Sequence, residues 1–227
     1  MTRLAIIPAR GGSKRLPRKN LLPFLGRPMI VHTIEAALAT QAFERVVVST
    51  EDAEIASVAK DAGALVHSRA AGLASDAARV TDVCLAVLDA EEQAGRMHAL
   101  FACLYATAPL RRAEDIQAVL APVDARETDF AMAVTTYAVA PHQALRREPD
   151  GSLSAMWPDL IERRASEVGE LFVDNGSTYA ARVAPFRRHL TFYGPGLRGH
   201  VMPRERSVDI DERADYELAC FYAASRG

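Results

Sequence analysis

Blocks of apolar and polar positions alternate along the first 140 residues, and they predict strands and helices in turn. Short continuous apolar runs are typical of strands buried on both faces of a sheet. Such runs occupy residues 4–8, 45–50, 65–66, 99–106 and 129–137. Helical spacing of apolar positions lies between them, at residues 28–38, 51–64, 79–94 and onward to about residue 120. This order predicts an α/β fold with a mostly parallel sheet and helices on both faces.

The alternation stops after Pro141. Residues 142–172 are polar and show little periodicity, and the Pro-Asp-Gly sequence at 149–151 is typical of a hairpin turn. We therefore expect a single domain over residues 1–227, with an extension at about 142–172 that acts as a dimerisation or lid arm. A strand at 177–183 returns to the sheet. A strand at 206–211 and a helix at 212–225 complete the prediction.

Composition and charge exclude several classes of function. The 227 residues are 49% hydrophobic and carry a net charge of -2, which fits a globular protein with a core. The near-neutral charge argues against nucleic acid or a membrane surface as a partner. No apolar run approaches the ~20 residues that span a bilayer. Three widely spaced cysteines argue against a zinc site or a disulfide framework. We expect a cytoplasmic protein.

Five basic residues gather in one loop near the start of the chain, in the sequence RGGSKRLPRKN at 10–20. The connection at 9–27 is far longer than the roughly 2 to 6 residues usual between a strand and a helix. It follows the first strand, so it lies at the edge of the sheet where ligands bind. Glycines allow close backbone approach, and cations hold phosphate oxygens. The Walker and G-x-G-x-x-G patterns are absent. The alternative is a solvated basic loop, but the placement favours phosphate binding.

A pair of aspartates stands near the end of the chain, in Ser207-Val208-Asp209-Ile210-Asp211. In a strand, Asp209 and Asp211 would project from the same face. Two neighbouring carboxylates repel each other, and a hard divalent cation such as Mg²⁺ relieves that repulsion. Two structural interpretations remain open. Asp211 could cap the following helix, and Asp209 could form an ion pair with the basic loop.

Five segments together resemble the cytidylyltransferases that activate sialic acids. They are LAIIPARGGSKRLPRKN at 4–20, LASD at 73–76, YATAPLR at 105–111, NGSTY at 175–179 and SVDIDERAD at 207–215. The resemblance runs along nearly the whole chain in consistent order. It implies a Rossmann-like nucleotide-diphospho-sugar transferase fold, a homodimer built through an inserted arm, and Mg²⁺ with Mn²⁺ as a substitute. It also implies CTP and a nine-carbon keto-acid sugar as substrates, with CMP-sugar and pyrophosphate as products.

The resemblance assigns site residues by position. The nucleotide site comprises Arg10, Gly11, Gly12, Ser13, Lys14, Lys19, Asn20 and Arg69. The sugar site comprises Tyr105, Gln143, Arg164, Asn175 and Tyr179, and the metal ligands are Asp209 and Asp211. We expect catalysis to rest on charge neutralisation by Arg10, Lys14, Lys19, Asp209 and Asp211.

The sugar side departs from the family pattern. Tyr105 stands where sialic-acid enzymes carry a glutamine, and CLYATAP is closer to the pseudaminic-acid branch. That branch carries HDAG where this chain has VDNG, so the substrate is expected to be pseudaminic, N-acylneuraminic or legionaminic acid. One alternative is a nucleotidyltransferase for the eight-carbon acid Kdo or another sugar. A non-catalytic nucleotide-binding protein is the other, and it would be expected to lack the basic loop or the aspartate pair.

Overall fold

Seven strands form one sheet in the order β11-β7-β10-β6-β1-β4-β5. The computed structural model describes residues 2–75 and 77–225. The strands are β1 (Arg3–Pro8), β4 (Arg45–Thr50), β5 (Leu65–Ser68), β6 (Leu100–Leu104), β7 (Phe130–Thr136), β10 (Phe172–Arg182) and β11 (Arg198–Val201). Neighbouring strands pair in parallel, except that β10 runs antiparallel to both β6 and β7. The predicted α/β fold with a mostly parallel sheet is confirmed.

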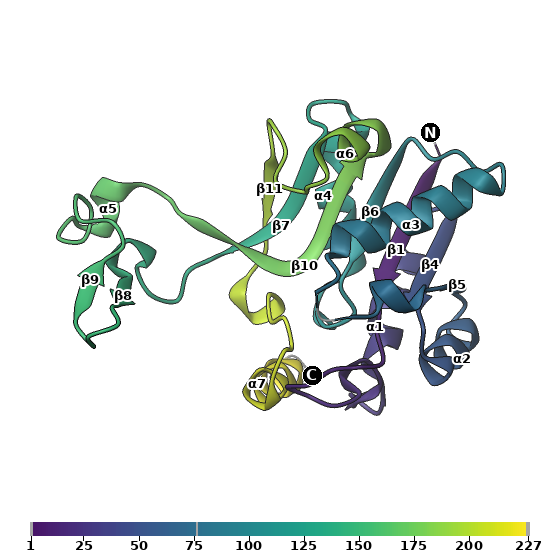
Figure 1. Ribbon diagram of the computed structural model, residues 1–227, viewed down its shortest axis with the longest axis horizontal. Helices are drawn as coiled ribbons and strands as arrows, with labels where there is room; N and C mark the ends of the chain where they lie inside the picture. The colour runs from purple at the N-terminus through teal and green to yellow at the C-terminus, as the bar shows by residue number, and fades with distance from the viewer. Residues whose placement is uncertain (1, 76, 226–227) are drawn as a thin grey trace.

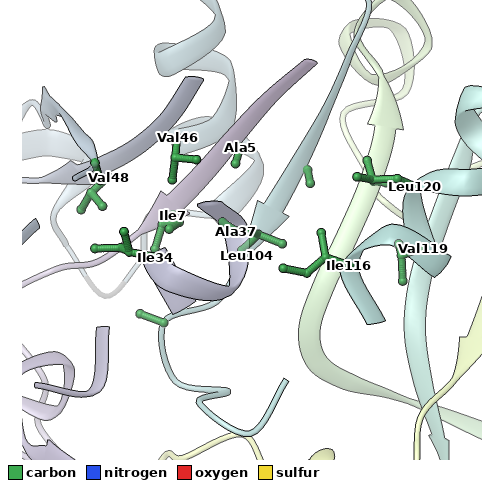
Figure 2. Packing of buried hydrophobic residues seen from close by; sticks show 14 of the residues in the cluster. Ala5, Ile7, Ile34, Ala37, Val46, Val48, Leu104, Ile116, Val119 and Leu120 are labelled. Atoms are coloured by element: carbon green, nitrogen blue, oxygen red, sulfur yellow. The ribbon is translucent and has the colours of Figure 1, made fainter. Parts of the chain in front are cut away.

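Helices cover both faces of the sheet, as predicted. One face carries α1 (Met29–Ala39), α2 (Ala53–Asp61) and α4 (Ala113–Asp124), and the other carries α3 (Val80–Gln93) and α6 (Val183–His189). Alternate residues of β1 supply the two faces, because successive strand side chains point in opposite directions. Ala5 and Ile7 join the first cluster, whereas Leu4 and Ile6 join the second. Figure 2 shows Ile34 of α1 close to Ile7.

The long connection between β1 and α1 is folded rather than open. It contains a 3-10 helix, η1 (Lys19–Leu21), and a small hairpin of β2 (Pro23–Phe24) and β3 (Arg27–Pro28). Phe24 is fully buried in a cluster with Leu16, and this contact anchors the loop. The basic residues are therefore carried on a segment with a defined shape.

An arm leaves the sheet after β7 and returns with β10. It holds a hairpin of β8 (Leu145–Arg147) and β9 (Leu153–Ala155), followed by α5 (Ala165–Val168). Figure 1 shows this hairpin and helix standing well away from the main sheet. Large apolar side chains are exposed along the arm and at its base, namely Tyr137, Val139, Leu145, Leu153, Met156, Trp157, Leu171 and Phe172.

The predicted strand at 206–211 is wrong. The 3-10 helix η4 (Arg204–Arg206) is followed by an irregular segment, and α7 (Arg213–Ala224) then begins. The place beside β7 is taken instead by β11, a short strand that the sequence pattern did not predict. Polar and apolar residues alternate at 207–211 because Val208 and Ile210 are buried in a cluster with residues of the β1–α1 loop and α7. A buried extended segment thus imitates a strand.

Candidate active site

A pocket of about 350 Å³ lies at the carboxyl ends of β1, β5 and β6. The predicted nucleotide residues that line it are Arg10, Lys19, Asn20 and Arg69. The remaining predicted residues, Gly11, Gly12, Ser13 and Lys14, lie on the same loop but do not line the pocket. Strand ends of a parallel sheet and the basic loop therefore meet at one concave surface, as expected for a ligand site in this architecture.

Asn20 and Arg69 are fixed by hydrogen bonds to neighbouring backbone. The Asn20 side-chain amide donates to the carbonyl of Arg10 at 2.9 Å, which ties the two ends of the basic loop together. Arg69 follows β5, is almost fully buried, and donates to the Ser49 carbonyl at 2.6 Å. Burial lowers the pKa of Arg69. A cation is thus held in place at the pocket wall.

Acidic side chains hold Arg15, Arg18 and Lys19 of the basic loop. Asp211 accepts from Arg15 at 2.6 Å and from Lys19 at 2.8 Å. Arg18 pairs with the side chains of Asp52 and Glu54, around the start of α2. The alternative in which Asp209 pairs with the loop is not what the described residues show, because Asp211 forms these ion pairs instead.

The backbone of the basic loop also approaches α2 closely. The Gly11 amide donates to Glu51 at 2.8 Å. A Cβ at Gly11 would collide with the side chain of Asp52, the residue that caps α2. Glycine is required at position 11 for this close packing, whatever its role toward a ligand. Sequence reasoning missed Glu51 and Asp52, which looked like the ordinary acidic start of a helix.

Asp209 and Asp211 are both partly buried, but their carboxylates have different partners. Asp209 Oδ1 accepts a hydrogen bond from Thr107 at 2.5 Å. Burial raises the pKa of Asp209 to about 6, the Thr107 hydrogen bond opposes that rise, and the Asp211 charge adds to it. Burial also acts on Asp211, but Lys19 and Arg15 outweigh it and lower the pKa of that carboxyl. The two aspartates therefore have different electrostatic environments.

The helix-capping interpretation of Asp211 is wrong. The N-cap of α7 is Glu212, in a capping box with Asp215. The Asp211 amide donates to the Asp215 carboxylate at 3.0 Å, so its own carboxylate remains directed at the basic loop. Thr107 also fixes the segment, because its carbonyl accepts from the Ile210 amide at 2.8 Å. Thr107 was not predicted from the sequence.

A second pocket, of about 390 Å³, adjoins the first and shares Tyr105 with it. It is lined by Tyr105, Thr135, Val173, Asp174, Asn175, Gly176, Tyr179, Ser207 and Asp209. Three of the predicted sugar residues, Tyr105, Asn175 and Tyr179, are therefore brought together beside Asp209. Gln143 and Arg164 are exposed on the arm, and neither lines the two pockets within one chain.

The aspartate pair provides the oxygen ligands that a hard cation prefers. Among the described residues, no group of three or more His, Cys, Asp or Glu side chains could hold a metal alone. None of the ion pairs in this described part of the chain involves Asp209. A partly buried carboxylate whose pKa is raised is stabilised as an anion when a cation binds beside it. The residues fit a divalent cation that completes its shell with ligand oxygens.

Comparison with known proteins identifies the family. The family model described as cytidylyltransferase matches residues 4–148, which is more than half of the chain. The chain belongs to the cytidylyltransferase family. It is therefore an enzyme of the nucleotidyltransferase class, and the basic loop and first pocket lie within the matched region.

Three curated relatives align with nearly all of this cytidylyltransferase. A pseudaminic acid cytidylyltransferase of Campylobacter jejuni is 31% identical over 96% of this chain and 95% of its own. A CMP-N,N'-diacetyllegionaminic acid synthase of Legionella pneumophila is 32% identical over 95% and 93%. An N-acylneuraminate cytidylyltransferase of Escherichia coli is 31% identical over 95% of this chain, but the match covers 51% of that longer protein.

Solved structures show the same fold at low sequence identity. A CMP:2-keto-3-deoxy-manno-octonic acid synthetase complexed with CTP superposes with a TM-score of 0.72 over the whole of both chains, at 20% identity. A 4-diphosphocytidyl-2C-methyl-D-erythritol synthase from Anaerococcus prevotii gives 0.64 over 98% of both, at 12% identity. The predicted nucleotidyltransferase fold is confirmed. In the part of the chain that the structure describes, no helix has the length and apolar character to cross a membrane.

Proposed function

We propose that this cytidylyltransferase joins CTP to a nonulosonic acid and releases the CMP-sugar and pyrophosphate. All three relatives are named for nonulosonic acids, and they align over at least 95% of this chain. Pseudaminic acid is the first substrate to test, because the CLYATAP segment is closest to that branch. N-acylneuraminic and legionaminic acids are the comparisons.

The observation that carries this proposal is the direct contact between the basic loop and the aspartate segment. Lys19 lines the first pocket and is bonded to Asp211, while Asp209 lines the second pocket. Two adjoining pockets thus meet at a junction of cations and carboxylates. A triphosphate in the first and a sugar acid in the second would place their reacting groups at this junction.

The chain's own residues act in this reaction by positioning and by charge neutralisation. Arg10, Lys19 and Arg69 offset the charge of the triphosphate, and Lys14 extends this positive field along the loop. The anomeric hydroxyl of the sugar attacks the α-phosphate, and pyrophosphate leaves. Holding both substrates in neighbouring pockets makes the attack effectively intramolecular. A nucleophilic side chain is not required, and Ser13 serves at most as a hydrogen-bond donor.

We also propose Asp209 and Asp211 as the ligands of Mg²⁺, with Mn²⁺ as a substitute. When bound, the cation would neutralise phosphate charge and lower the pKa of a coordinated hydroxyl. Thr107 holds the Asp209 carboxylate in place, and Lys19 and Arg15 orient that of Asp211. Cation binding at Asp209 would favour the carboxylate form and so lower the raised pKa of that group.

A homodimer formed through the arm is the proposed assembly. The exposed apolar side chains of the arm include Leu153 at 63% and Trp157 at 45%, and a second copy would remove such surface from water. Gln143 and Arg164 lie on this arm, so a sugar-binding role for them requires a partner's pocket. A reaction that consumes CTP supports the cytoplasmic location expected from the sequence.

The proposed function is tested by replacing the central ion pair. Lys19→Met should reduce kcat/KM for CTP by about 100-fold or more, because a charge-assisted contact to phosphate is lost. Arg27→Met, at an exposed pair with Glu35 on the same connection, is the matched control and should remain active. Equal activity in the two variants would contradict the assignment of the first pocket to the triphosphate.

A further inference from the structure

One carboxylate in the second pocket has no assigned role, although three donors converge on it. Asp174 Oδ1 accepts from the Gly176 amide at 2.9 Å and from the Tyr179 hydroxyl at 3.0 Å. Its Oδ2 accepts from Tyr179 at 2.9 Å and from Tyr193 at 2.6 Å. Asp174 and Tyr179 both line the pocket, and Asp174 is two residues before the glycine that packs against Asp209.

The hydroxyl protons of Tyr179 and Tyr193 already form hydrogen bonds to this carboxylate. Burial, together with the Asp174 charge, raises the pKa of Tyr193 to about 12, and it raises that of Tyr179 further. Both phenols therefore keep their protons at neutral pH and donate them to Asp174. The Tyr105 hydroxyl also lines the pocket and is hydrogen-bonded to that of Tyr179. The lone pairs that remain on Tyr179 and Asp174 can only accept hydrogen bonds from a ligand.

Other polar groups of the pocket are oriented in the same way. Thr135 donates its hydroxyl proton to the Met202 carbonyl at 2.9 Å, and Ser207 donates to the Pro203 carbonyl at 2.9 Å. The Asn175 amide donates to the Ser207 hydroxyl at 3.1 Å. These donors all face protein acceptors. The atoms of these side chains that remain open to a ligand are therefore hydrogen-bond acceptors.

The charge of the second pocket also favours hydrogen-bond donors of a ligand over its acceptors. Two carboxylates, Asp174 and Asp209, line it, and its described lining contains no lysine, arginine or histidine. The cations lie across Tyr105 in the first pocket. A ligand carboxylate placed at Asp174 would meet like charge and buried acceptors, and both would disfavour it.

We propose that Asp174, together with the two tyrosine hydroxyls it orders, determines which sugar acid is accepted and how it is oriented. The cluster selects hydroxyl or N–H donors of the sugar, and it directs the sugar carboxylate toward the cations of the first pocket. This inference rests on the proposed function, because it assigns the second pocket to the sugar. Asp174 acts by binding and positioning and takes no part in bond formation.

Asp174→Asn tests the proposal with little change of shape. The amide would add donors where the phenols already donate, so the ordered acceptors would be lost. We expect KM for the sugar to rise about 10- to 100-fold, as for loss of a hydrogen bond to a charged group, with KM for CTP within about twofold. Tyr193→Phe removes one of three donors and should raise KM for the sugar by a smaller factor.

The matched control is Asp124→Asn. Asp124 also forms a paired carboxylate, with Arg3 at 2.7 Å, but at the opposite end of the sheet. The Asp124→Asn variant should leave KM for the sugar and KM for CTP unchanged. Thermal unfolding of all three variants separates a binding role from a structural one. If Asp174→Asn lowers the melting temperature and raises both KM values together, Asp174 is structural and the proposal is wrong.

Sugar analogues that lack one donor at a time provide the decisive comparison. The wild type should lose at least about tenfold in kcat/KM with the analogue that lacks the Asp174-facing donor, and Asp174→Asn should not discriminate against it. If the analogue lowers kcat/KM by the same factor in Asp174→Asn as in the wild type, the two effects are independent and the inference is wrong. The proposed function would still stand in that case, provided that the wild type turns over the parent sugar. If the wild type turns over no nonulosonic acid with CTP, the proposed function fails and this inference fails with it.

Discussion

At the scale of single residues, Gly176 determines where the Asp209 carboxylate can lie. Its φ of +64° belongs to the left-handed region, which disfavours residues with a Cβ. A Cβ there would also stand 2.5 Å from Asp209 Oδ2. Side-chain substitution at this position therefore acts on the backbone and on the neighbouring carboxylate together.

Gly176→Ala should abolish most activity and cost about 1–2 kcal/mol of unfolding free energy. Gly26→Ala is the matched control, because Gly26 also has a positive φ, +78°, but open space around its Cβ position. It should show the same order of destabilisation with normal activity. Pyrophosphate release and chemical denaturation measure the two effects. Unchanged activity in Gly176→Ala would show that the position of Asp209 does not matter.

Asp211 is the residue through which the two halves of the proposed triphosphate site meet. Asp211→Ala should reduce turnover by at least about 10³-fold, since it removes a proposed metal ligand and frees Lys19 and Arg15. The protein should stay folded, as judged by circular dichroism. Glu54→Ala breaks an ion pair to Arg18 of the same loop, and it should keep near-normal turnover. Near-normal turnover in Asp211→Ala would disprove the metal assignment.

At the scale of elements, a charge cluster joins α3 to β4 and to the loop before β6, at the end of the sheet opposite the pockets. Glu91 of α3 is buried and pairs with Arg45 at 2.9 Å, Arg96 at 2.8 Å and His98 at 3.2 Å. The Arg96 hydrogen bonds, with help from His98 and Arg45 and against the effect of burial, lower the pKa of Glu91 to about 2. The cluster is a stability feature, distant from the site.

Glu91→Gln should lower the unfolding free energy at pH 7 by about 1–3 kcal/mol, because Arg45 and Arg96 lose the counter-charge of a buried carboxylate. The Glu91 pKa is lower in the folded state than in the unfolded state. Its contribution is therefore complete above pH 4.5 and is lost as pH falls toward 2. Urea denaturation across this range should show the two proteins converging. A difference that stays constant down to pH 2 would contradict the assignment, and activity at pH 7 should be unaffected.

Sequence predicts an element well when its pattern of apolar and polar residues has only one structural explanation. The run at 4–8 forms a strand because both of its faces are buried. Arg69, which was assigned by resemblance, follows β5 and lines the first pocket. The alternation at 207–211 had another cause, burial of Val208 and Ile210 against α7, so the predicted strand did not form. The two-residue spacing of Asp209 and Asp211 could not reveal that their side chains have different partners.

The sugar side was the part that sequence could predict least. Asp174 meets Tyr179 across an irregularity in the pairing of β10 with β7, and Tyr193 arrives from the loop after α6. Such contacts depend on register and on loop paths that no local pattern encodes. Gln143 and Arg164 were assigned by resemblance alone, and one chain does not bring them to the pocket.

At the scale of the whole molecule, the arm is the feature that a single chain does not explain. Figure 1 shows the arm standing apart from the sheet, and its exposed apolar residues lack a covering surface within the described chain. A second copy supplies that surface in the proposed homodimer. The mass of the protein in solution tests this directly.

Leu145→Ser with Leu153→Ser should weaken dimerisation by at least about tenfold, because both exposed apolar side chains lose their contribution to burial. Sedimentation across a range of concentrations measures the shift. Phe221→Ser is the control, since Phe221 is 64% exposed, close to the 63% of Leu153, but lies on α7 outside the arm. A wild type that remains monomeric, or a double variant that dimerises as the wild type does, would contradict the proposed interface.

The central claim is that this enzyme transfers a cytidylyl group to a nonulosonic acid. Pyrophosphate release, measured with each of the four nucleoside triphosphates against pseudaminic, N-acylneuraminic, legionaminic and Kdo substrates, tests it most directly. We predict release with CTP and a nonulosonic acid, dependent on Mg²⁺ and abolished by EDTA. Absence of release with CTP and every nonulosonic acid, or a preference for Kdo, would contradict the account.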